Sequence, residues 1–171
     1  MTKRLIVFSG LPGTGKSQLA EVVARQCGIP VFAKDWLEAV LLDVGLMPAE
    51  RLGYAGYDLL TTLARRQLSL GQSAILDSVA SFERIRRQWR ELAHEFGAQW
   101  QVVECVCSDE GVHRERLNGR HRHIPGWHEL TWADVQRVNS YYEPWLEERL
   151  VVDGIRPFPE NLQTVLTYLQ S

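Results

Sequence analysis

This 171-residue sequence contains no hydrophobic run that approaches the about 18 residues needed for a membrane-spanning helix. It also lacks an excess of one charge, because its formal net charge is −2, so it has no long-range attraction to nucleic acid. Cysteine is scarce, and an odd count of three, Cys27, Cys105 and Cys107, indicates structural thiols in a reducing compartment. A strand and a motif follow residue 3 directly and leave no room for a cleaved signal peptide, so we expect a cytoplasmic protein that does not associate with membranes.

The chain also lacks internal repeats, low-complexity segments and linkers rich in Gly, Pro or Ser. Its length and its 45% content of hydrophobic residues suit one domain with a sizeable core. We therefore predict a single domain over residues 1–171.

Short apolar runs alternate with amphipathic stretches along the whole sequence. We expect strands at residues 5–8, 30–33, 74–77, 100–107 and 150–153. We expect helices at residues 17–26, 36–44, 54–70, 82–96, 110–117, 131–142 and 161–169. The strands are continuous apolar runs, which is typical of parallel strands buried on both faces. The pattern predicts an α/β fold in three layers, with a five-stranded parallel sheet between helices.

The most specific motif is G-x-x-x-x-G-K-[ST], which residues 10–17 match in full. Glycines let successive backbone N–H groups point at phosphate oxygens, and the following helix adds the positive end of its dipole. Lys16 would contact the β- and γ-phosphates, and the Ser17 hydroxyl would bind Mg²⁺. We predict an ATP site formed by Gly10, Leu11, Pro12, Gly13, Thr14, Gly15, Lys16, Ser17 and Gln18.

Two aspartates follow predicted strands. Asp77 ends the apolar run 73–77, as a Walker B aspartate does, and would hold Mg²⁺ or its waters. Asp35 lies just after the second strand, where it could orient an acceptor hydroxyl and take its proton. An N-cap for a helix that starts at Trp36 is a compatible interpretation of Asp35.

Arginines gather in two places. In the predicted lid, about residues 113–130, Arg116 and Arg120 would close over ATP and neutralise charge on the transferred phosphoryl group, and Arg120 would also bind the nucleotide, whereas Arg114 would lie on the outer helix surface. We interpret the other cluster as a solvated helix face, with contact to an anionic acceptor as the alternative; it consists of Arg84, Arg86, Arg87 and Arg90. The histidines of the lid lack a recognisable metal-ligand spacing and are interpreted as structural or lid residues; they are His121, His123 and His128.

These features together resemble the small P-loop kinases, a group that includes polynucleotide 5′-kinase domains, zeta-toxin-like kinases, gluconate kinase and chloramphenicol phosphotransferase. The resemblance rests on the P-loop, Asp35, the run 75–78 and the Arg116–Arg120 element. It implies a P-loop NTPase fold of the nucleoside-kinase type, ATP with Mg²⁺, an aspartate acting on the acceptor hydroxyl, and an Arg-bearing lid. Asp35, Asp77 and the pair Arg116 and Arg120 match these positions.

One departure from the group concerns the acceptor. Polynucleotide kinase domains place an arginine a few residues after the acceptor aspartate, and residues 36–39 here contain none. Trp36, Tyr54 and Tyr57 suggest a pocket for a small ring-bearing or partly apolar molecule, with core packing of these rings as the alternative.

We predict transfer of the γ-phosphoryl group of ATP to a hydroxyl of a small molecule. The alternatives are a polynucleotide 5′-hydroxyl or nucleotide kinase, in which Arg65, Arg84 or Arg87 would bind the anion, and an ATPase switch acting on a protein partner.

Overall fold

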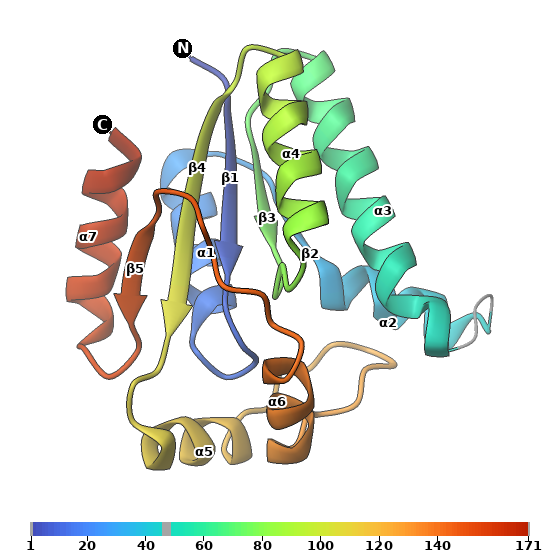
Figure 1. Ribbon diagram of the computed structural model, residues 1–171, viewed down its shortest axis with the longest axis vertical. Helices are drawn as coiled ribbons and strands as arrows, with labels where there is room; N and C mark the ends of the chain where they lie inside the picture. Colours follow the sequence, from blue (N-terminus) through green and yellow to red (C-terminus); the bar gives the residue numbers. More distant parts are fainter. Residues whose placement is uncertain (1, 46–48, 171) are drawn as a thin grey trace.

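The computed structural model describes residues 2–45 and 49–170 and contains an alternating series of strands and helices (Figure 1). The strands are β1 (Arg4–Ser9), β2 (Val31–Ala33), β3 (Ala74–Asp77), β4 (Gln99–Val106) and β5 (Leu150–Asp153). The helices are α1 (Lys16–Cys27), α2 (Lys34–Asp43), α3 (Ala49–Ser69), α4 (Glu83–Glu95), α5 (Glu110–Asn118), α6 (Trp132–Asn139) and α7 (Phe158–Gln170). No helix in these two ranges is long and apolar enough to cross a membrane.

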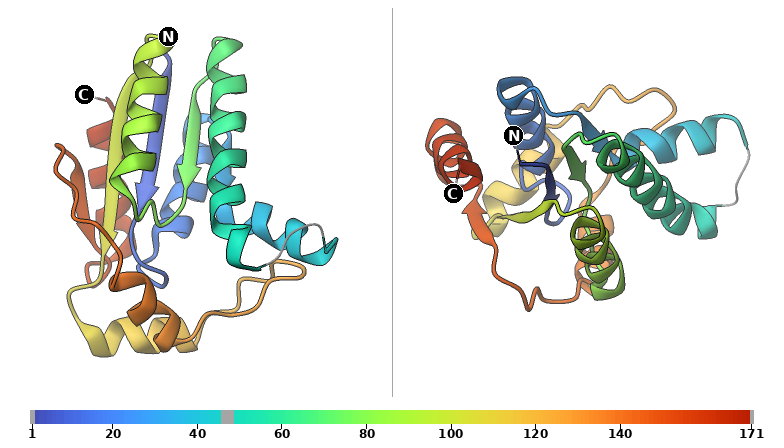
Figure 2. Two further views of the ribbon diagram at one scale, coloured as in Figure 1. Left: turned by 45° about the vertical axis from the view of Figure 1, so that its right-hand side comes forward. Right: turned by 90° about the horizontal axis from the view of Figure 1, so that it is seen from above.

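The strands form one parallel sheet in the order β2-β3-β1-β4-β5. The central strand β1 is fully buried from Leu5 to Ser9, which explains its unbroken apolar sequence. Its side chains alternate between two cores: Leu5 and Val7 face α3 and α4, and Ile6 and Phe8 face α1 and α7. Figure 2 shows these helix pairs on opposite faces of the sheet. The α/β fold in three layers that the sequence predicts is confirmed.

Strand register brings the candidate site residues to one edge of the sheet. Phe8 of β1 pairs with Asp77 of β3, and Asp77 in turn pairs with Ala33 of β2. The P-loop, the end of β3 and the start of α2 therefore emerge side by side at the carboxyl ends of the strands, where ligands bind in open parallel sheets. Helices α5 and α6 and the segment 119–131 between them cross the same end of the sheet (Figure 1).

Helices α2, α3 and α7 begin two or more residues earlier than the sequence predicts, α7 at Phe158 instead of residue 161. α2 begins at Lys34 with Ala33 as its N-cap and no side-chain cap, so Asp35 lies in the first turn and the capping interpretation is wrong. α3 begins at Ala49, more than a turn before the predicted start at Tyr54, and the buried Leu52 belongs to its inner face.

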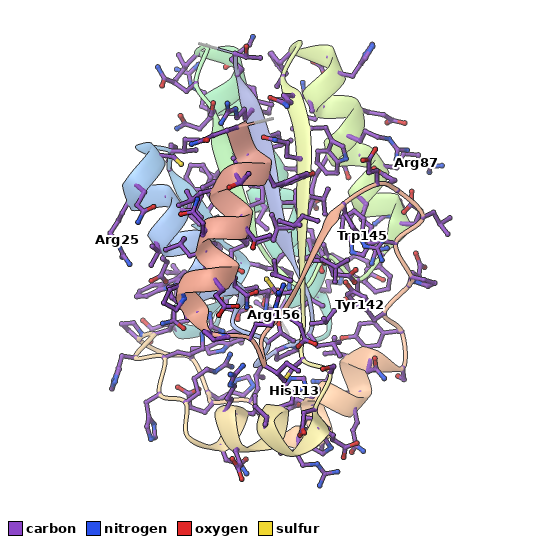
Figure 3. All side chains as sticks on the ribbon, turned by 90° about the vertical axis from the view of Figure 1, so that its left-hand side faces the viewer. Arg25, Arg87, His113, Tyr142, Trp145 and Arg156 are labelled. Atoms are coloured by element: carbon purple, nitrogen blue, oxygen red, sulfur yellow. The ribbon has the colours of Figure 1, made fainter. Side chains whose placement is uncertain are left out.

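Arg86 is the other correction, because it belongs to the core and not to a solvated face. Its side chain is fully buried and donates hydrogen bonds to the backbone carbonyls of Ala80, Glu143 and Pro144. Its guanidinium also lies over the rings of the aromatic pair labelled in Figure 3, Tyr142 and Trp145. Three carbonyl acceptors from two loops replace the water that this cation loses on burial. The helical pattern of α4 alone does not reveal such partners.

Candidate functional site

The P-loop between β1 and α1 has the backbone shape that its glycines permit. Gly10 has a φ of 135°, and a Cβ there would lie 2.1 Å from the carbonyl oxygen of Cys105. Gly13 has a φ of 87°, and its Cβ would lie 3.1 Å from the ring of His113. Neither position therefore accepts a side chain. His113 also holds the loop from outside, because its Nε2 lies 2.7 Å from the carbonyl oxygen of Pro12.

Lys16, Ser17 and Asp77 meet beneath this loop. Lys16 is 7% exposed and Asp77 4% exposed. Burial lowers the pKa of Lys16, and the nearby carboxylates Asp77 and Asp35 oppose that shift. Burial likewise raises the pKa of Asp77, against the opposing effects of Lys16 and a hydrogen bond with Ser17. The three side chains thus form a compact polar group at the start of α1.

This group fits a magnesium ion. The Oδ1 atom of Asp77 is buried and has no hydrogen-bond partner among the described residues, and the Ser17 hydroxyl lies beside it. Carboxylate and hydroxyl oxygens suit Mg²⁺, which takes few protein ligands and completes its shell with phosphate oxygens and water. No cluster of three or more His, Cys, Asp or Glu side chains able to hold a metal occurs in ranges 2–45 and 49–170. Any such ion would therefore be bound jointly with a nucleotide.

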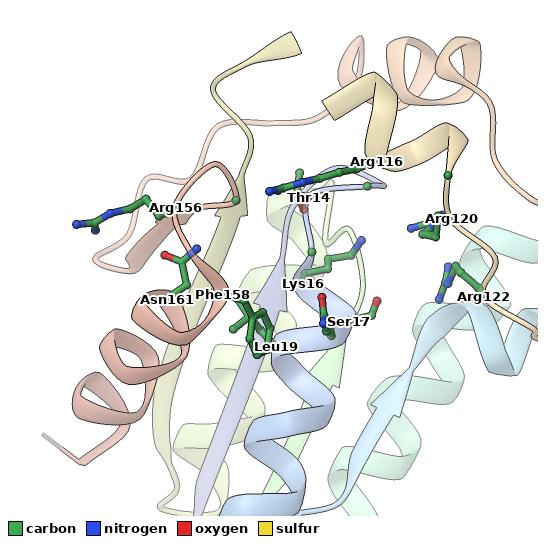
Figure 4. A pocket seen from close by; sticks show the side chains of 15 residues that line it. Thr14, Lys16, Ser17, Leu19, Arg116, Arg120, Arg122, Arg156, Phe158 and Asn161 are labelled. Atoms are coloured by element: carbon green, nitrogen blue, oxygen red, sulfur yellow. The ribbon is translucent and has the colours of Figure 1, made fainter. Parts of the chain in front are cut away.

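A pocket of about 550 Å³ opens above the P-loop (Figure 4). Residues 13–19 form its floor, and Arg116, Arg120 and Arg122 border it on the side of α5. The guanidinium of Arg116 packs against Gly154, because a Cβ atom added to that glycine would lie 2.7 Å from Arg116 Nη1. The remaining wall comes from β5 and α7, through Gly154, Arg156, Phe158 and Asn161. Arg114 does not line the pocket; it pairs with Glu110 at 2.6 Å with its side chain 49% exposed.

The described residues leave two N–H groups of the Arg120 guanidinium without hydrogen-bond acceptors. Its Nε and Nη2 atoms are buried without a hydrogen-bond partner in that part of the chain, and Glu129 Oε2 lies 4.0 Å from its Nε. Burial, followed by the nearby charge of Arg122, lowers the pKa of this guanidinium. Two buried N–H donors beside a phosphate-sized cradle are suited to an anion.

Arg122 is a site residue that the sequence analysis did not select. Its Nη1 forms an ion pair with Oδ2 of Asp35, and both side chains are largely buried. Burial acts to raise the pKa of Asp35, but Arg122 and Lys16 outweigh it and hold that pKa below its usual value. The sequence held a signal that could have identified Arg122. It lies two residues after Arg120, and alternate residues of an extended segment point to the same side.

A second pocket, of about 700 Å³, adjoins the first and shares Lys16, Arg120 and Arg122 with it. Asp35 and Glu38 line this pocket from α2, and Tyr54 and Tyr57 line it from α3. Trp36 does not: its side chain is 46% exposed on the far face of α2, so the prediction of Trp36 as a pocket residue is wrong. Because the helix starts at Lys34, residues 35, 38 and 42 face inward and residue 36 faces outward.

Several other candidates lie elsewhere. Arg65, Arg84 and Arg87 line neither pocket, and Arg65 instead pairs with Glu95 at 2.6 Å. Within the segment 119–131, the rings of His121 and His123 have centroids 6.2 Å apart, and His128 stacks on Trp127 at 5.0 Å. The second pocket includes His128 and Trp127 in its wall.

The comparisons with known proteins agree on the fold. The family model described as AAA domain matches residues 5–145. A protein from Chloroflexus aurantiacus with the provisional designation of kinase is 26% identical, with a TM-score of 0.78 over 99% of this chain and 98% of its own. A gluconokinase from Sinorhizobium meliloti is 20% identical, with a TM-score of 0.74 over 99% and 93% of the chains. The Mycobacterium tuberculosis APS kinase in complex with AMPPNP and APS is 22% identical, with a TM-score of 0.72 over 99% of both chains. No curated protein matches the sequence.

Proposed function

The chain belongs to the AAA domain family of P-loop proteins, and we propose that it is an ATP-dependent kinase that phosphorylates a hydroxyl group of a small molecule. One observation carries this proposal: two pockets meet at Lys16, Arg120 and Arg122, with the P-loop in one and Asp35 in the other. A phosphoryl donor and a hydroxyl acceptor bound in these pockets would approach each other across three cations. Proximity and electrostatic stabilisation of this kind are the main requirements of phosphoryl transfer.

In the donor pocket, the backbone N–H groups of residues 10–17 would bind the β- and γ-phosphates, and Lys16 would neutralise their charge. Ser17 and Asp77 would hold Mg²⁺, which would supply positive charge that neutralises the transferred phosphoryl group. Gln18, which also lines the pocket, would border the phosphates from the first turn of α1.

In the acceptor pocket, Asp35 would accept a hydrogen bond from the acceptor hydroxyl and direct its oxygen toward the γ-phosphorus. Its pKa is held below the usual value by Arg122 and Lys16, so it is a weak base while these pairs persist. We therefore propose that Asp35 first orients the acceptor hydroxyl. It would accept the hydroxyl proton late, when the acceptor oxygen has begun to bond to phosphorus and has become less basic.

Arg116 and Arg120 would stabilise the charge that develops on the transferred phosphoryl group. The unpartnered N–H donors of Arg120 support this role directly. We propose that the segment 113–130 acts as a lid, because it carries both arginines and crosses the carboxyl ends of the strands (Figure 1). Closure would exclude water, which competes with the acceptor for the phosphoryl group.

A small molecule is favoured over a polynucleotide as acceptor. None of the arginines that would have to hold a nucleic acid, Arg65, Arg84 and Arg87, lines either pocket. The gluconokinase and the APS kinase of similar fold carry the names of kinases for small compounds, which supports the same choice.

The test is ATP consumption by the purified chain, measured with and without a panel of hydroxyl compounds and 5′-hydroxyl oligonucleotides. We expect stimulation by a small alcohol and a phosphorylated product of the same stoichiometry as ADP. Asp35→Asn should lower kcat by about 10²- to 10⁴-fold and leave ATP affinity within a few-fold. Asp43→Asn is the matched control, because Asp43 ends the same helix and lines neither pocket. ATP consumption that ignores every alcohol and also survives Asp35→Asn would refute the kinase assignment.

A further inference from the structure

The wall of the acceptor pocket is unusually rich in rings. Away from the shared cations, its rim carries Tyr54, Phe82, Trp127 and Tyr141, and aliphatic side chains fill the spaces between them. Phe82 and Tyr141 stack with centroids 5.6 Å apart and planes at 10°, so the pair forms a flat apolar ledge. Such a surface stabilises a ligand through burial of carbon and ring stacking.

The basic side chains beyond the shared cations are already paired within the described chain. Lys34 forms an ion pair with Glu38 and lies 4.7 Å from the centre of the Tyr57 ring. Arg137 pairs with Asp134 at 2.9 Å. An anionic acceptor held by Lys34 would take that cation from Glu38, which is 4% exposed, and would leave that carboxylate buried without a cation. Removing one partner of a buried pair in this way is strongly unfavourable.

A polyhydroxyl acceptor fits equally poorly. It would need a partner for each of several hydroxyl groups, whereas much of the wall is ring and aliphatic carbon. Among the described residues of the wall, the charged acceptors for a hydroxyl proton are two carboxylates, Asp35 and the neighbouring Glu38.

We propose that the phosphoryl acceptor is an uncharged alcohol with an apolar, ring-bearing body, whose single hydroxyl reaches Asp35 while its ring lies against Phe82 and Tyr141. This inference rests on the proposed kinase function and specifies its substrate class. It separates this chain from kinases whose acceptors are sugar acids or nucleotides.

The test compares acceptors that share one hydroxymethyl group and differ in the rest of the molecule. Para-methylbenzyl alcohol, para-(hydroxymethyl)benzoate, sorbitol and gluconate are each incubated with enzyme and labelled ATP, and kcat/KM for transfer is measured. We expect the neutral ring alcohol to exceed each of the others by about 10-fold or more. Glu38→Gln keeps the shape of the Glu38 side chain and leaves Lys34 without its carboxylate partner. The difference in kcat/KM between the alcohol and the benzoate should therefore become smaller.

The ring ledge is tested by Tyr141→Ala, with Trp36→Ala as the control. Both side chains are aromatic and similarly exposed, at 40% and 46%, but only Tyr141 lines the pocket. We expect Tyr141→Ala to lower kcat/KM for the ring alcohol by about 10-fold and Trp36→Ala to leave it unchanged. Preferred phosphorylation of the benzoate, sorbitol or gluconate would overturn the substrate class and leave the kinase function intact. Phosphorylation of none of the four would also overturn the substrate class, and ATP consumption that in addition survives Asp35→Asn would overturn the kinase function.

Discussion

Arg122 and Asp35 form an ion pair across 87 positions of sequence, at the junction of the donor and acceptor pockets. The pair joins the proposed lid to the first turn of α2. It favours the ionised form of Asp35, which lines the proposed acceptor pocket, and Arg122 itself borders both pockets. Any movement of Arg122 toward a phosphate would release Asp35, so the pair would couple occupation of the two pockets.

Arg122→Gln should shift the acidic limb of the pH profile of kcat/KM for the acceptor toward higher pH. Burial raises the pKa of Asp35 and Arg122 opposes it, so without Arg122 the carboxylate should be protonated at higher pH and lose its capacity to accept a hydrogen bond. Arg156→Gln is the control, because it removes a cation that lines the donor pocket and not the acceptor pocket. Identical acidic limbs in the two variants would show that Arg122 does not set the ionisation of Asp35.

Arg120→Ala should lower kcat by about 10²- to 10³-fold and change the KM for ATP much less, because its buried N–H donors are positioned for charge that develops in the transition state. Arg114→Ala is the matched control, since that arginine lies on the outer face of α5 and pairs with Glu110. Steady-state kinetics at saturating acceptor distinguish the two. A larger effect at Arg114 would mean that the arginine facing the phosphates has been misassigned.

Arg86→Leu should destabilise the fold by about 3 kcal/mol or more, because three backbone carbonyls lose their donor in a buried place. Arg87→Leu, one residue further on the exposed face of α4, should change the free energy of unfolding by less than about 0.5 kcal/mol. Urea unfolding followed by tryptophan fluorescence measures both. Equal losses in the two variants would contradict the buried role of Arg86.

Asp134→Ala should destabilise the protein at neutral pH by about 1 kcal/mol, because Asp134 and Thr131 form a capping box at the start of α6. A hydrogen bond from the Thr131 backbone N–H, together with bonds from the Thr131 hydroxyl and from Arg137, lowers the pKa of Asp134 from 3.8 to about 2. A carboxylate with a lowered pKa stabilises the folded state above its unfolded pKa and loses that effect as pH falls through the folded value. The difference in melting temperature between wild type and variant should therefore be full at pH 6 and shrink between about pH 4 and pH 2. A difference that stays constant over this range would argue against the cap.

The sequence predicts the strands well and the helix starts less well. Apolar runs such as that of β1 are recognisable because the strand is buried on both faces and tolerates few polar side chains. The start of α2 lacks a capping side chain, so no local signal marks Lys34 as its first residue. Successive residues of a helix are about 100° apart, so Trp36 points away from the pocket that Asp35 lines and is 46% exposed.

By itself, the sequence determined the three-layer α/β fold and the P-loop, because both depend on local patterns: the period of apolar residues, and glycines at positions such as Gly10 that exclude any side chain. Only the tertiary structure showed that Arg122 borders both pockets, that Trp36 lies outside the second pocket, and that Phe82, Trp127 and Tyr141 line it. Arg122 is paired with a residue from another part of the chain, and Arg86 donates its hydrogen bonds to carbonyls of two loops. The partners of long polar side chains come from segments that are distant in sequence. The spacing of residues along one helix or strand therefore does not indicate which segment packs against it.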